Sequence, residues 1–348
     1  MMIKRIAIIG AGAIGSALGG LLRRAGHDVV LVGRGAHITA IRETGLRIDG
    51  VLGSFTVRVE AAEALASRPD VAFLTVKSQD VLSALQANRV LLQDVPVVTF
   101  QNGVRSDELA AGVVGRERLA SVVVNLSANF LTPGEVTILY ADALVLGRPF
   151  APNDAEVGEI AAILRDAFPT RISGNIGGAH WLKLIVNLNN AFPALTGSTY
   201  REVYQHPFLG RLAVRAMREG LEVADRAGIA LESLPDMPVL LARAMRLLPL
   251  WLAARLAAAK IRRIETRWPL LGSTLQSVRR RRPTEIDYLN AEVVRLGREL
   301  GIFTPVNATI VELVHQLEQT KRFLSAEAIR GEIDKRERVE SSADTRFD

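Results

Sequence analysis

The segment Ile6-Ala7-Ile8-Ile9-Gly10-Ala11-Gly12-Ala13-Ile14-Gly15 decides the fold of the first half of the chain. Its first four residues form an apolar run that predicts a buried strand, and Ser16–Arg24 has the pattern of a helix. Between them, Gly10–Gly15 has the order G-x-G-x-x-G, and a second strand, His27–Val32, follows the helix. A glycine motif in this position within a strand–helix–strand unit is typical of a dinucleotide site.

Each glycine of the motif has a physical role. Gly10 permits the tight turn out of the strand, Gly12 lets the backbone approach a pyrophosphate, and Gly15 lets the helix pack closely on the sheet. The N-terminus of the helix then faces the phosphates. We therefore expect all six residues, Gly10, Ala11, Gly12, Ala13, Ile14 and Gly15, to bind the cofactor.

The residues after the second strand indicate which dinucleotide is bound. Units that bind NAD usually end this strand with Asp or Glu, which holds the ribose 2′-hydroxyl. Here Asp28–Val32 is followed by Gly33 and Arg34, so an arginine stands where the carboxylate would be. A guanidinium can pair with a 2′-phosphate through two parallel hydrogen bonds. The sequence therefore predicts NADP (as NADPH), with Arg34 as the ligand of the 2′-phosphate; the alternative is that Arg34 is one more exposed arginine.

Length and composition are those of a globular protein with two domains. The chain has 348 residues, of which 49% are hydrophobic and 23% charged, with a net charge of +6 that suits anionic ligands. It contains no cysteine, which excludes disulfides and thiolate catalysis. Its five histidines show no metal-ligand spacing, so we expect no metal site. With only three Trp and four Tyr, a nucleic-acid surface is not expected either.

An uncharged stretch near the N-terminus has a second interpretation. Ile6–Leu22 carries no charge and follows Lys4-Arg5, as a signal peptide or a membrane span would. Its glycine motif and the strand that follows it favour the dinucleotide unit instead. We expect a cytoplasmic protein with an intact N-terminus and no membrane span.

The first half of the chain alternates strands with helices, which predicts a Rossmann-type, doubly wound and mostly parallel sheet over residues 1–174. The expected strands are a hairpin at Gly45–Val59 with its turn at Asp49-Gly50, then Val71–Val76, Val95–Phe100, Leu119–Leu126, Glu135–Leu139 and Ala143–Leu146. Ligands on such sheets lie beyond the carboxyl ends of the strands. Because Lys77 and Asn102 each follow a strand, both are candidates for the floor of the site.

The second half, residues 175–336, has only helical patterns and predicts a separate all-helical domain. The expected helices are His180–Asn190, Pro207–Ala227, Val239–Arg263, Thr274–Arg280, Glu285–Leu300, Ala308–Gln319 and Ser325–Lys335. Pro249 should kink or divide the third of them. The polar residues 337–348 are expected to form a disordered tail.

Two segments of this half carry candidate chemistry. Lys183 and Asn187 are four residues apart and share one face of an otherwise apolar helix, which suits a proton donor that hydrogen-bonds a substrate carbonyl. The alternative is that Lys183 extends to solvent from a packed helix. Further on, Glu285 falls in the first turn of an expected helix, where a carboxylate is favoured electrostatically or could accept a hydrogen bond from a substrate hydroxyl.

Together these motifs resemble those of the ketopantoate reductases. The matching segments are Gly10–Gly15, Lys77, Gln101–Gly103, Lys183–Asn187, Ser273, Pro283–Tyr288 and Gly301–Asn307, in the order found in that family. The resemblance implies a Rossmann domain, a helical C-terminal domain and NADPH-dependent reduction of a 2-oxo acid. In pantothenate and coenzyme A biosynthesis the substrate is 2-dehydropantoate and the product is (R)-pantoate.

The resemblance also implies roles for single residues. Lys183 matches the catalytic lysine, and Glu285 matches the glutamate that binds the substrate hydroxyl and supports the lysine. Arg34 and Lys77 match cofactor contacts. The polar residues that match positions around substrate and nicotinamide are Asn102, Asn187, Asn190 and Ser273.

The chain departs from the family pattern where the substrate is held. The family's second asparagine falls at Ala191, with Asn190 beside it, so a helix irregularity would be needed to restore the contact. Leu270 and Ser277 replace an asparagine and an aspartate, which makes the pocket more apolar. A paralogous reductase of a more apolar 2-oxo acid and a non-catalytic NADP-binding regulator are therefore alternatives.

An arginine-rich stretch, Pro238–Pro269, is longer than the family requires. It could form an extra helical pair packed on the domain or on a second subunit of a homodimer. It could also form a lid over the substrate or a helix on a membrane surface. The adjacent run Arg279–Arg282 fits a solvated or lid segment near an anionic substrate.

Overall fold

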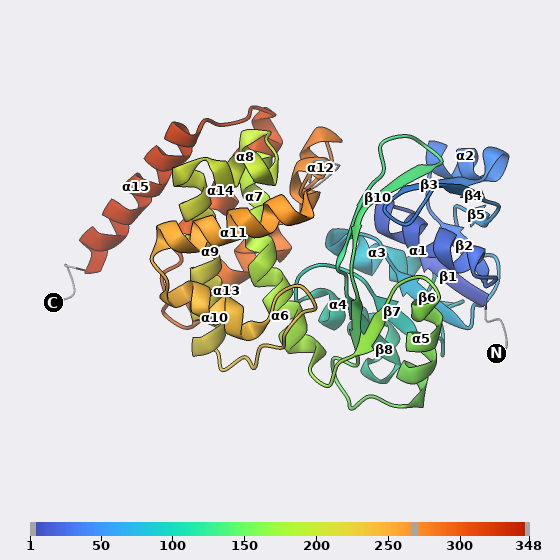
Figure 1. Cartoon of the computed structure of the whole chain (residues 1–348). Helices are drawn as coiled ribbons and strands as arrows, with labels where there is room; N and C mark the ends of the chain where they lie inside the picture. Colours follow the sequence, from blue (N-terminus) through green and yellow to red (C-terminus); the bar gives the residue numbers. More distant parts are fainter. Residues whose placement is uncertain (1–4, 266–270, 345–348) are drawn as a thin grey trace. The chain divides into compact units, whose positions relative to one another are not determined.

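The computed structural model describes residues 5–265 and 271–344, which form two compact units. The first unit extends to His180 and includes the later segment Glu232–Asp236. The second unit contains Trp181–Leu231 and the chain from Met237 onward. The boundary therefore falls inside helix α6 (Ile176–Asn187), which is labelled in Figure 1.

The first unit is built on an eight-stranded sheet with the order β12-β11-β8-β7-β6-β1-β2-β5. All neighbouring strands are parallel except β8 and β11, which are antiparallel. This is the predicted doubly wound sheet. Its strands are β1 (Arg5–Ile9), β2 (Asp28–Val32), β5 (Glu60–Ala62), β6 (Val71–Leu74), β7 (Val97–Thr99), β8 (Leu119–Val123), β11 (Leu144–Gly147) and β12 (Thr170–Ile172).

Helices cover this sheet because its strands are apolar on both faces. One face packs against α1 (Ala13–Arg24), α2 (Ala36–Thr44) and α5 (Ala155–Arg165), and the other against α3 (Val81–Ala87) and α4 (Ser106–Val114). In α1 the buried leucines Leu18 and Leu22 contribute to the first core, while α3 contributes Val81 and Leu85 to the second.

A second, four-stranded sheet differs from the single sheet predicted for this half. It contains β3 (Leu46–Gly50), β4 (Phe55–Val57), β9 (Leu126–Asn129) and β10 (Glu135–Ala141), in the order β4-β3-β10-β9. The expected strand Leu119–Leu126 is wrong because the chain leaves the large sheet after Val123 and begins β9 at Leu126. The hairpin exists, but its turn follows Gly50 instead of including it. Gly50, with φ +119°, pairs with Ile138 of β10, whose carbonyl oxygen would lie 1.9 Å from any Cβ there.

The second unit contains helices and no strands among its described residues. After α6 come the 3-10 helix η3 (Leu188–Asn190), α7 (Ala191–Thr196), α8 (Tyr200–Gln205), α9 (Pro207–Arg226), α10 (Val239–Leu247), α11 (Leu250–Ile264), α12 (Ser273–Arg279), the 3-10 helix η4 (Ile286–Tyr288), α13 (Asn290–Glu299), α14 (Pro305–Thr320) and α15 (Ala326–Asp344). None of the helices in the described ranges is long and apolar enough to cross a membrane.

Three boundaries in this unit bear on the predictions. Pro249 divides the long arginine-rich stretch into α10 and α11, as predicted, and α11 packs on α8 and α9. Residues 266–269 of that stretch and Leu270 lie outside the described residues. The expected start of a helix at Glu285 is wrong, because the short η4 comes first and α13 begins at Asn290. The tail is also a correction, since α15 continues past Glu337 to Asp344.

Candidate functional site

The glycine loop connects β1 to α1 with very little space inside it. Gly10 has φ +117°, which side-chain-bearing residues rarely adopt, and a Cβ there would lie 2.5 Å from the Val76 nitrogen. A Cβ on Gly15 would lie 2.2 Å from the Gly10 carbonyl oxygen and 2.4 Å from Thr75 Oγ1. These two glycines let the loop lie against the chain that follows β6.

Gly12, in contrast, has open space where a side chain would be. A Cβ on Gly12 would meet no atom within 4 Å. Gly12 is also the residue that precedes α1, where no side chain caps the helix and the first turn carries no acidic residue. A helix N-terminus with open space before it and no carboxylate of its own fits a phosphate group. The residues present therefore fit the pyrophosphate of a dinucleotide.

Arg34 is joined to this loop through the end of β2. The carbonyl oxygen of Val32 accepts hydrogen bonds from the backbone N–H groups of both Gly10 and Ala11, at 2.9 Å each. A Cβ on Gly33 would lie 2.8 Å from the Cβ of Ala11. The exposed Arg34 follows Gly33 directly, so its backbone is held beside the glycine loop while its side chain is open to solvent.

Lys77 and Asn102 lie on loops that hydrogen bonds connect to each other and to the glycine loop. Thr75 donates its hydroxyl to the Gly10 carbonyl oxygen at 2.8 Å. The amide of Gln101 donates to the carbonyl oxygens of Leu74 and Val76, both at 2.8 Å. Ser78 Oγ donates to the Asn102 carbonyl oxygen at 3.2 Å. The carboxyl ends of β1, β6 and β7 therefore meet at one edge of the sheet.

The sequence motifs predict no role for Thr75 or Ser78, and Gln101 belongs to a motif without a role of its own. All three are polar residues at or just after the end of a buried strand. That position was the available signal, because a polar side chain there can bind the backbone of the next loop.

In the helical unit, α6 presents Lys183 and Asn187 on one face. Leu182, Leu184 and Ile185, which lie beside Lys183 in the sequence, are fully buried, so the helix is anchored by its apolar side. Lys183 is half-buried and Asn187 is 9% exposed. Because α6 ends at Asn187, this face continues directly into the 3-10 helix η3.

Asn190 and Ser273 lie together, although they are far apart in the sequence. Asn190 ends η3 and is 7% exposed, and its Nδ2 lies 3.5 Å from the Oγ of Ser273, the first residue of α12. The hydroxyl of Tyr200 donates to Asn190 Oδ1. The irregularity that the sequence required near Ala191 is present, because η3 interrupts the α-helical path just before that residue.

Glu285 is buried, but not in the first turn of a helix. It is 7% exposed and precedes η4. The preceding Thr284 is held by a hydrogen bond of 2.6 Å from its backbone N–H to Glu318 Oε1 of α14, and its Oγ1 accepts from the Ile286 N–H at 3.3 Å. The burial of Glu285 is therefore set by a tight turn packed on α14, which propensity alone did not predict.

A buried polar network from α13, α14 and α9 holds the backbone of η3 at Leu188. Asn290 Nδ2 donates to the Leu188 carbonyl oxygen at 3.1 Å and to Asn307 Oδ1 at 2.9 Å. Asn307 Nδ2 in turn donates to Glu219 Oε2 at 2.7 Å. Burial raises the pKa of Glu219 to about 7, against the lowering effect of these hydrogen bonds.

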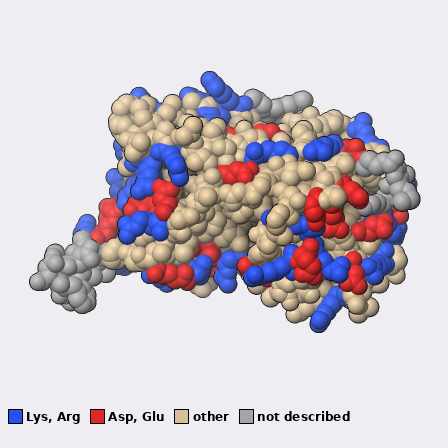
Figure 2. All heavy atoms as spheres, turned by 90° about the horizontal axis from the view of Figure 1, so that it is seen from below, with Lys and Arg blue, Asp and Glu red and all other residues tan. Residues whose placement is uncertain are grey.

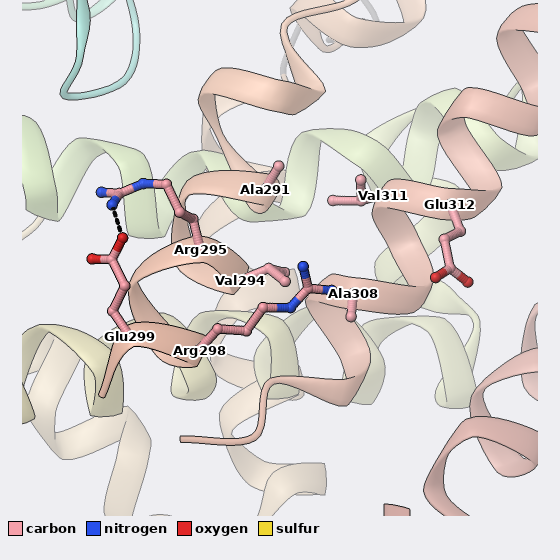
Figure 3. A pocket seen from close by; sticks show the side chains of 8 residues that line it. All are labelled: Ala291, Val294, Arg295, Arg298, Glu299, Ala308, Val311 and Glu312. Atoms are coloured by element: carbon pink, nitrogen blue, oxygen red, sulfur yellow. Dashed lines mark hydrogen bonds and ion pairs between the residues drawn. The ribbon is translucent and has the colours of Figure 1, made fainter. Parts of the chain in front are cut away.

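A separate hollow of about 440 Å³ lies between α13 and α14 (Figure 3). Its floor is apolar, and charged side chains stand at its rim, where Arg295 pairs with Glu299 at 2.5 Å. None of the predicted site residues lines it. The lining residues are Ala291, Val294, Arg295, Arg298, Glu299, Ala308, Val311 and Glu312.

Charge is mixed on the face shown in Figure 2, where basic and acidic side chains alternate instead of forming one broad basic field. Within the described ranges, no group of three or more His, Asp or Glu side chains is arranged to hold a metal ion.

Two models of one family match the chain, one for each half. The model described as "Ketopantoate reductase PanE/ApbA" matches residues 6–149, and its C-terminal counterpart matches residues 175–318. A 2-dehydropantoate 2-reductase of Pyrococcus horikoshii is 30% identical over 317 residues, which cover 90% of this chain and 97% of that protein. The chain belongs to the ketopantoate reductase family.

Other family members agree with this membership. A 2-dehydropantoate 2-reductase of Archaeoglobus fulgidus is 29% identical and is covered over 99% of its length. The crystal structure of a PanE/ApbA family ketopantoate reductase from Ralstonia eutropha JMP134 matches with a TM-score of 0.76 and 31% identity, over 91% of this chain and 99% of that one. A D-mandelate dehydrogenase solved with NADH and anilino(oxo)acetate shares the fold, with a TM-score of 0.77 and 22% identity over 91% and 99% of the two chains.

The family resemblance and the fold predicted from the sequence are therefore confirmed. The relatives named 2-dehydropantoate 2-reductase support an oxidoreductase. The roles of its individual site residues stay predictions.

Proposed function

We propose that this family member reduces a 2-oxo acid to a 2-hydroxy acid with NADPH, 2-dehydropantoate to (R)-pantoate being the first candidate. The observation that carries the proposal is the match to 2-dehydropantoate 2-reductases over 90% of the chain. The open space at Gly12, before the N-terminus of α1, supports it independently. The setting would be a cytoplasmic one, in pantothenate and coenzyme A biosynthesis.

The proposed roles follow from the chemistry of a carbonyl reduction. Bound NADPH supplies the hydride. Lys183 hydrogen-bonds the substrate carbonyl oxygen and delivers the proton, which stabilises the charge that develops there. Glu285 accepts from the substrate hydroxyl and supports the lysine.

Neutral donors hold the remaining polar groups of the substrate. We assign the carboxylate to Ser273 together with the asparagines Asn187 and Asn190, and we place Asn102 beside the nicotinamide. Discrimination by such a pocket depends on pairing these buried polar groups, because an unpaired one is costly.

For the cofactor, we propose that Gly10–Gly15 binds the pyrophosphate, while Lys77 and Arg34 bind its anionic groups. Arg34 is the residue that would favour NADPH over NADH, because a guanidinium pairs with the 2′-phosphate and a carboxylate there would repel it.

A second candidate is a reductase of a more apolar 2-oxo acid. Ala191, where the family pattern has asparagine, is 1% exposed. Ser277, where the pattern has aspartate, donates its hydroxyl to the Ser273 carbonyl oxygen at 2.9 Å, a hydrogen bond within α12. Both observations favour a pocket with fewer polar contacts than the pattern provides.

The test is NADPH and NADH oxidation measured side by side over a panel of 2-oxo acids. We expect turnover of 2-dehydropantoate with a preference for NADPH. Turnover of a bulkier, more apolar 2-oxo acid without turnover of 2-dehydropantoate would select the second candidate. No turnover of any 2-oxo acid with either cofactor would contradict the proposal.

A further inference from the structure

Three elements of the helical unit converge on the side chain of Asn190. Asn190 ends η3, Tyr200 begins α8 and Ser273 begins α12. The Tyr200 hydroxyl donates to Asn190 Oδ1, and Asn190 Nδ2 points to Ser273 Oγ at 3.5 Å. The two ends of one buried amide therefore have different partners.

The 3-10 turn rotates Asn190 toward the direction that residue 191 would have in an unbroken helix. A 3-10 helix advances about 120° per residue and an α-helix about 100°, so three residues of η3 add about 60°. Lys183 and Asn187 already share a face of α6. The tighter turn moves the amide of Asn190 toward the position of Ala191, which cannot hydrogen-bond through its side chain.

Tyr200 is held in place by its surroundings. Thr199 and Glu202 form a reciprocal capping box at the start of α8, with hydrogen bonds of 2.7 Å and 3.2 Å. Gly272 leaves room for the phenol, since a Cβ there would lie 2.8 Å from the Tyr200 hydroxyl oxygen. Burial raises the pKa of Tyr200 above its usual range, so the hydroxyl keeps its proton and remains a donor.

We propose that Tyr200 is a positioning residue that sets the orientation of the Asn190 amide, so that the NH₂ group is presented beside Ser273 to an oxygen of the 2-oxo acid. The phenol does this because it donates more strongly than it accepts, and so selects Oδ1 over Nδ2. Tyr200 acts through Asn190 and does not itself contact the substrate. This inference rests on the proposed function.

The test is steady-state kinetics of the full-length Tyr200→Phe enzyme with NADPH and the best 2-oxo acid of the panel. Without the phenol, the side-chain amide of Asn190 can flip and exchange the positions of Oδ1 and Nδ2. We therefore expect KM for the 2-oxo acid to rise about 3- to 10-fold, the effect of one hydrogen bond. The kcat and the Kd for NADPH should stay within about twofold of the parent, because no group that meets the reacting atoms has changed.

Tyr204 provides a matched control on the same helix. Its hydroxyl accepts a hydrogen bond of 3.3 Å from Asn189 Nδ2, the neighbouring asparagine. Tyr204→Phe removes the same atom from the same helix without touching Asn190. We expect it to leave KM unchanged, and an equal rise of KM in both variants would overturn the inference.

A second variant shows whether Tyr200 acts through Asn190. Adding Tyr200→Phe to an Asn190→Ala enzyme should have no further effect on KM, because the amide to be oriented is gone. The same fold-change in both backgrounds would contradict the inference. A parent enzyme that reduces no 2-oxo acid refutes the proposed function. If the parent is active and Tyr200→Phe leaves its KM unchanged, only the role of Tyr200 is refuted.

Discussion

Under the proposed function, the choice between NADPH and NADH would depend on one side chain beside the glycine loop. The loop, the end of β2 and the chain after β6 are joined through Gly10, Val32 and Thr75. All of these contacts are made by backbone atoms or by a hydroxyl, and none distinguishes one nicotinamide dinucleotide from the other. Arg34 is the charged residue at this place whose side chain could do so.

Replacing Arg34 with alanine should therefore weaken NADPH binding specifically. A charge-assisted hydrogen bond contributes about 1.5–3 kcal/mol, so we expect KM for NADPH to rise about 10- to 100-fold while KM for NADH changes little. The measurement is initial rate against cofactor concentration for both cofactors. Arg89→Ala, which removes an exposed arginine after α3, is the control. Equal effects of Arg34→Ala on both cofactors would remove its assigned role.

At this scale the sequence predicts where polar residues follow strands better than it predicts which contacts hold them. The position of Arg34 after Val32 and of Lys77 after β6 could be predicted because a strand followed by a polar residue is a local pattern. The contact between Asn190 and Ser273 spans a large stretch of sequence and depends on the path of η3. No local periodicity contains that information.

Helix α14 illustrates how an element depends on a side chain from another element. Thr304 before it makes no side-chain cap. Instead Glu219 of α9 accepts hydrogen bonds from the N–H groups of Val306 and Asn307, at 2.9 Å each. A carboxylate at this end of a helix also interacts favourably with the helix dipole.

The variant Glu219→Gln should lower the stability of the protein by about 1–3 kcal/mol near pH 5, because an amide NH₂ must then face a backbone N–H. The pKa of Glu219 is raised to about 7, so the folded state binds more protons than the unfolded state between pH 4.5 and 7. The stability of the parent should therefore fall relative to the variant as the pH rises through this range.

Chemical denaturation of both proteins at several pH values measures this difference. A difference that stays constant between pH 4.5 and 7, or that grows as the pH rises, would contradict a raised pKa for Glu219.

Most element types could be predicted from hydrophobic periodicity and from the positions of proline and glycine, but several boundaries could not. Pro249 divides α10 from α11 because proline cannot continue a helix, a rule that acts locally. The late start of α13 comes instead from Leu289, whose φ and ψ of −117° and −94° are not helical. The turn that precedes it is held on α14 by the hydrogen bond from the Thr284 N–H to Glu318, a long-range contact that the local sequence does not encode.

Within the first unit, His37 of α2 connects α1 with the loop that precedes β10 of the second sheet. Its Nδ1 accepts the N–H of Gly134 at 2.8 Å, so the proton is on Nε2, which donates to Ser16 Oγ at 2.9 Å. The ring centroid lies 4.1 Å from that of Phe130. Burial lowers the pKa of His37 to about 4, because a charged ring is disfavoured there.

This contact predicts how stability depends on pH. Between pH 6.5 and 4 the unfolded His37 takes up a proton that the folded one does not, so the parent loses stability as the pH falls through this window. The variant His37→Leu should have a lower Tm than the parent at pH 7.5, because it leaves the Gly134 N–H unpaired. The Tm difference should narrow toward pH 4, and a difference that widens would contradict this prediction.

The division into a sheet unit and a helical unit could be predicted because strand patterns alternate with helical ones in the first half, while only helical patterns follow residue 175. The second sheet could not, since β3 and β10 are parallel neighbours that lie far apart in sequence. Pairing of this kind is decided by the whole molecule, through cores shared by α1, α2 and both sheets.

The central claim is that Lys183 donates the proton in a reduction by NADPH, and one comparison tests it most directly. This is kcat for the best 2-oxo acid, measured with parent and Lys183→Ala enzymes alongside the Kd for NADPH. The account predicts a loss of about 10²- to 10⁴-fold in kcat, as for removal of a general acid, with NADPH binding retained. A Lys183→Ala enzyme that turns over at the parent rate would contradict it.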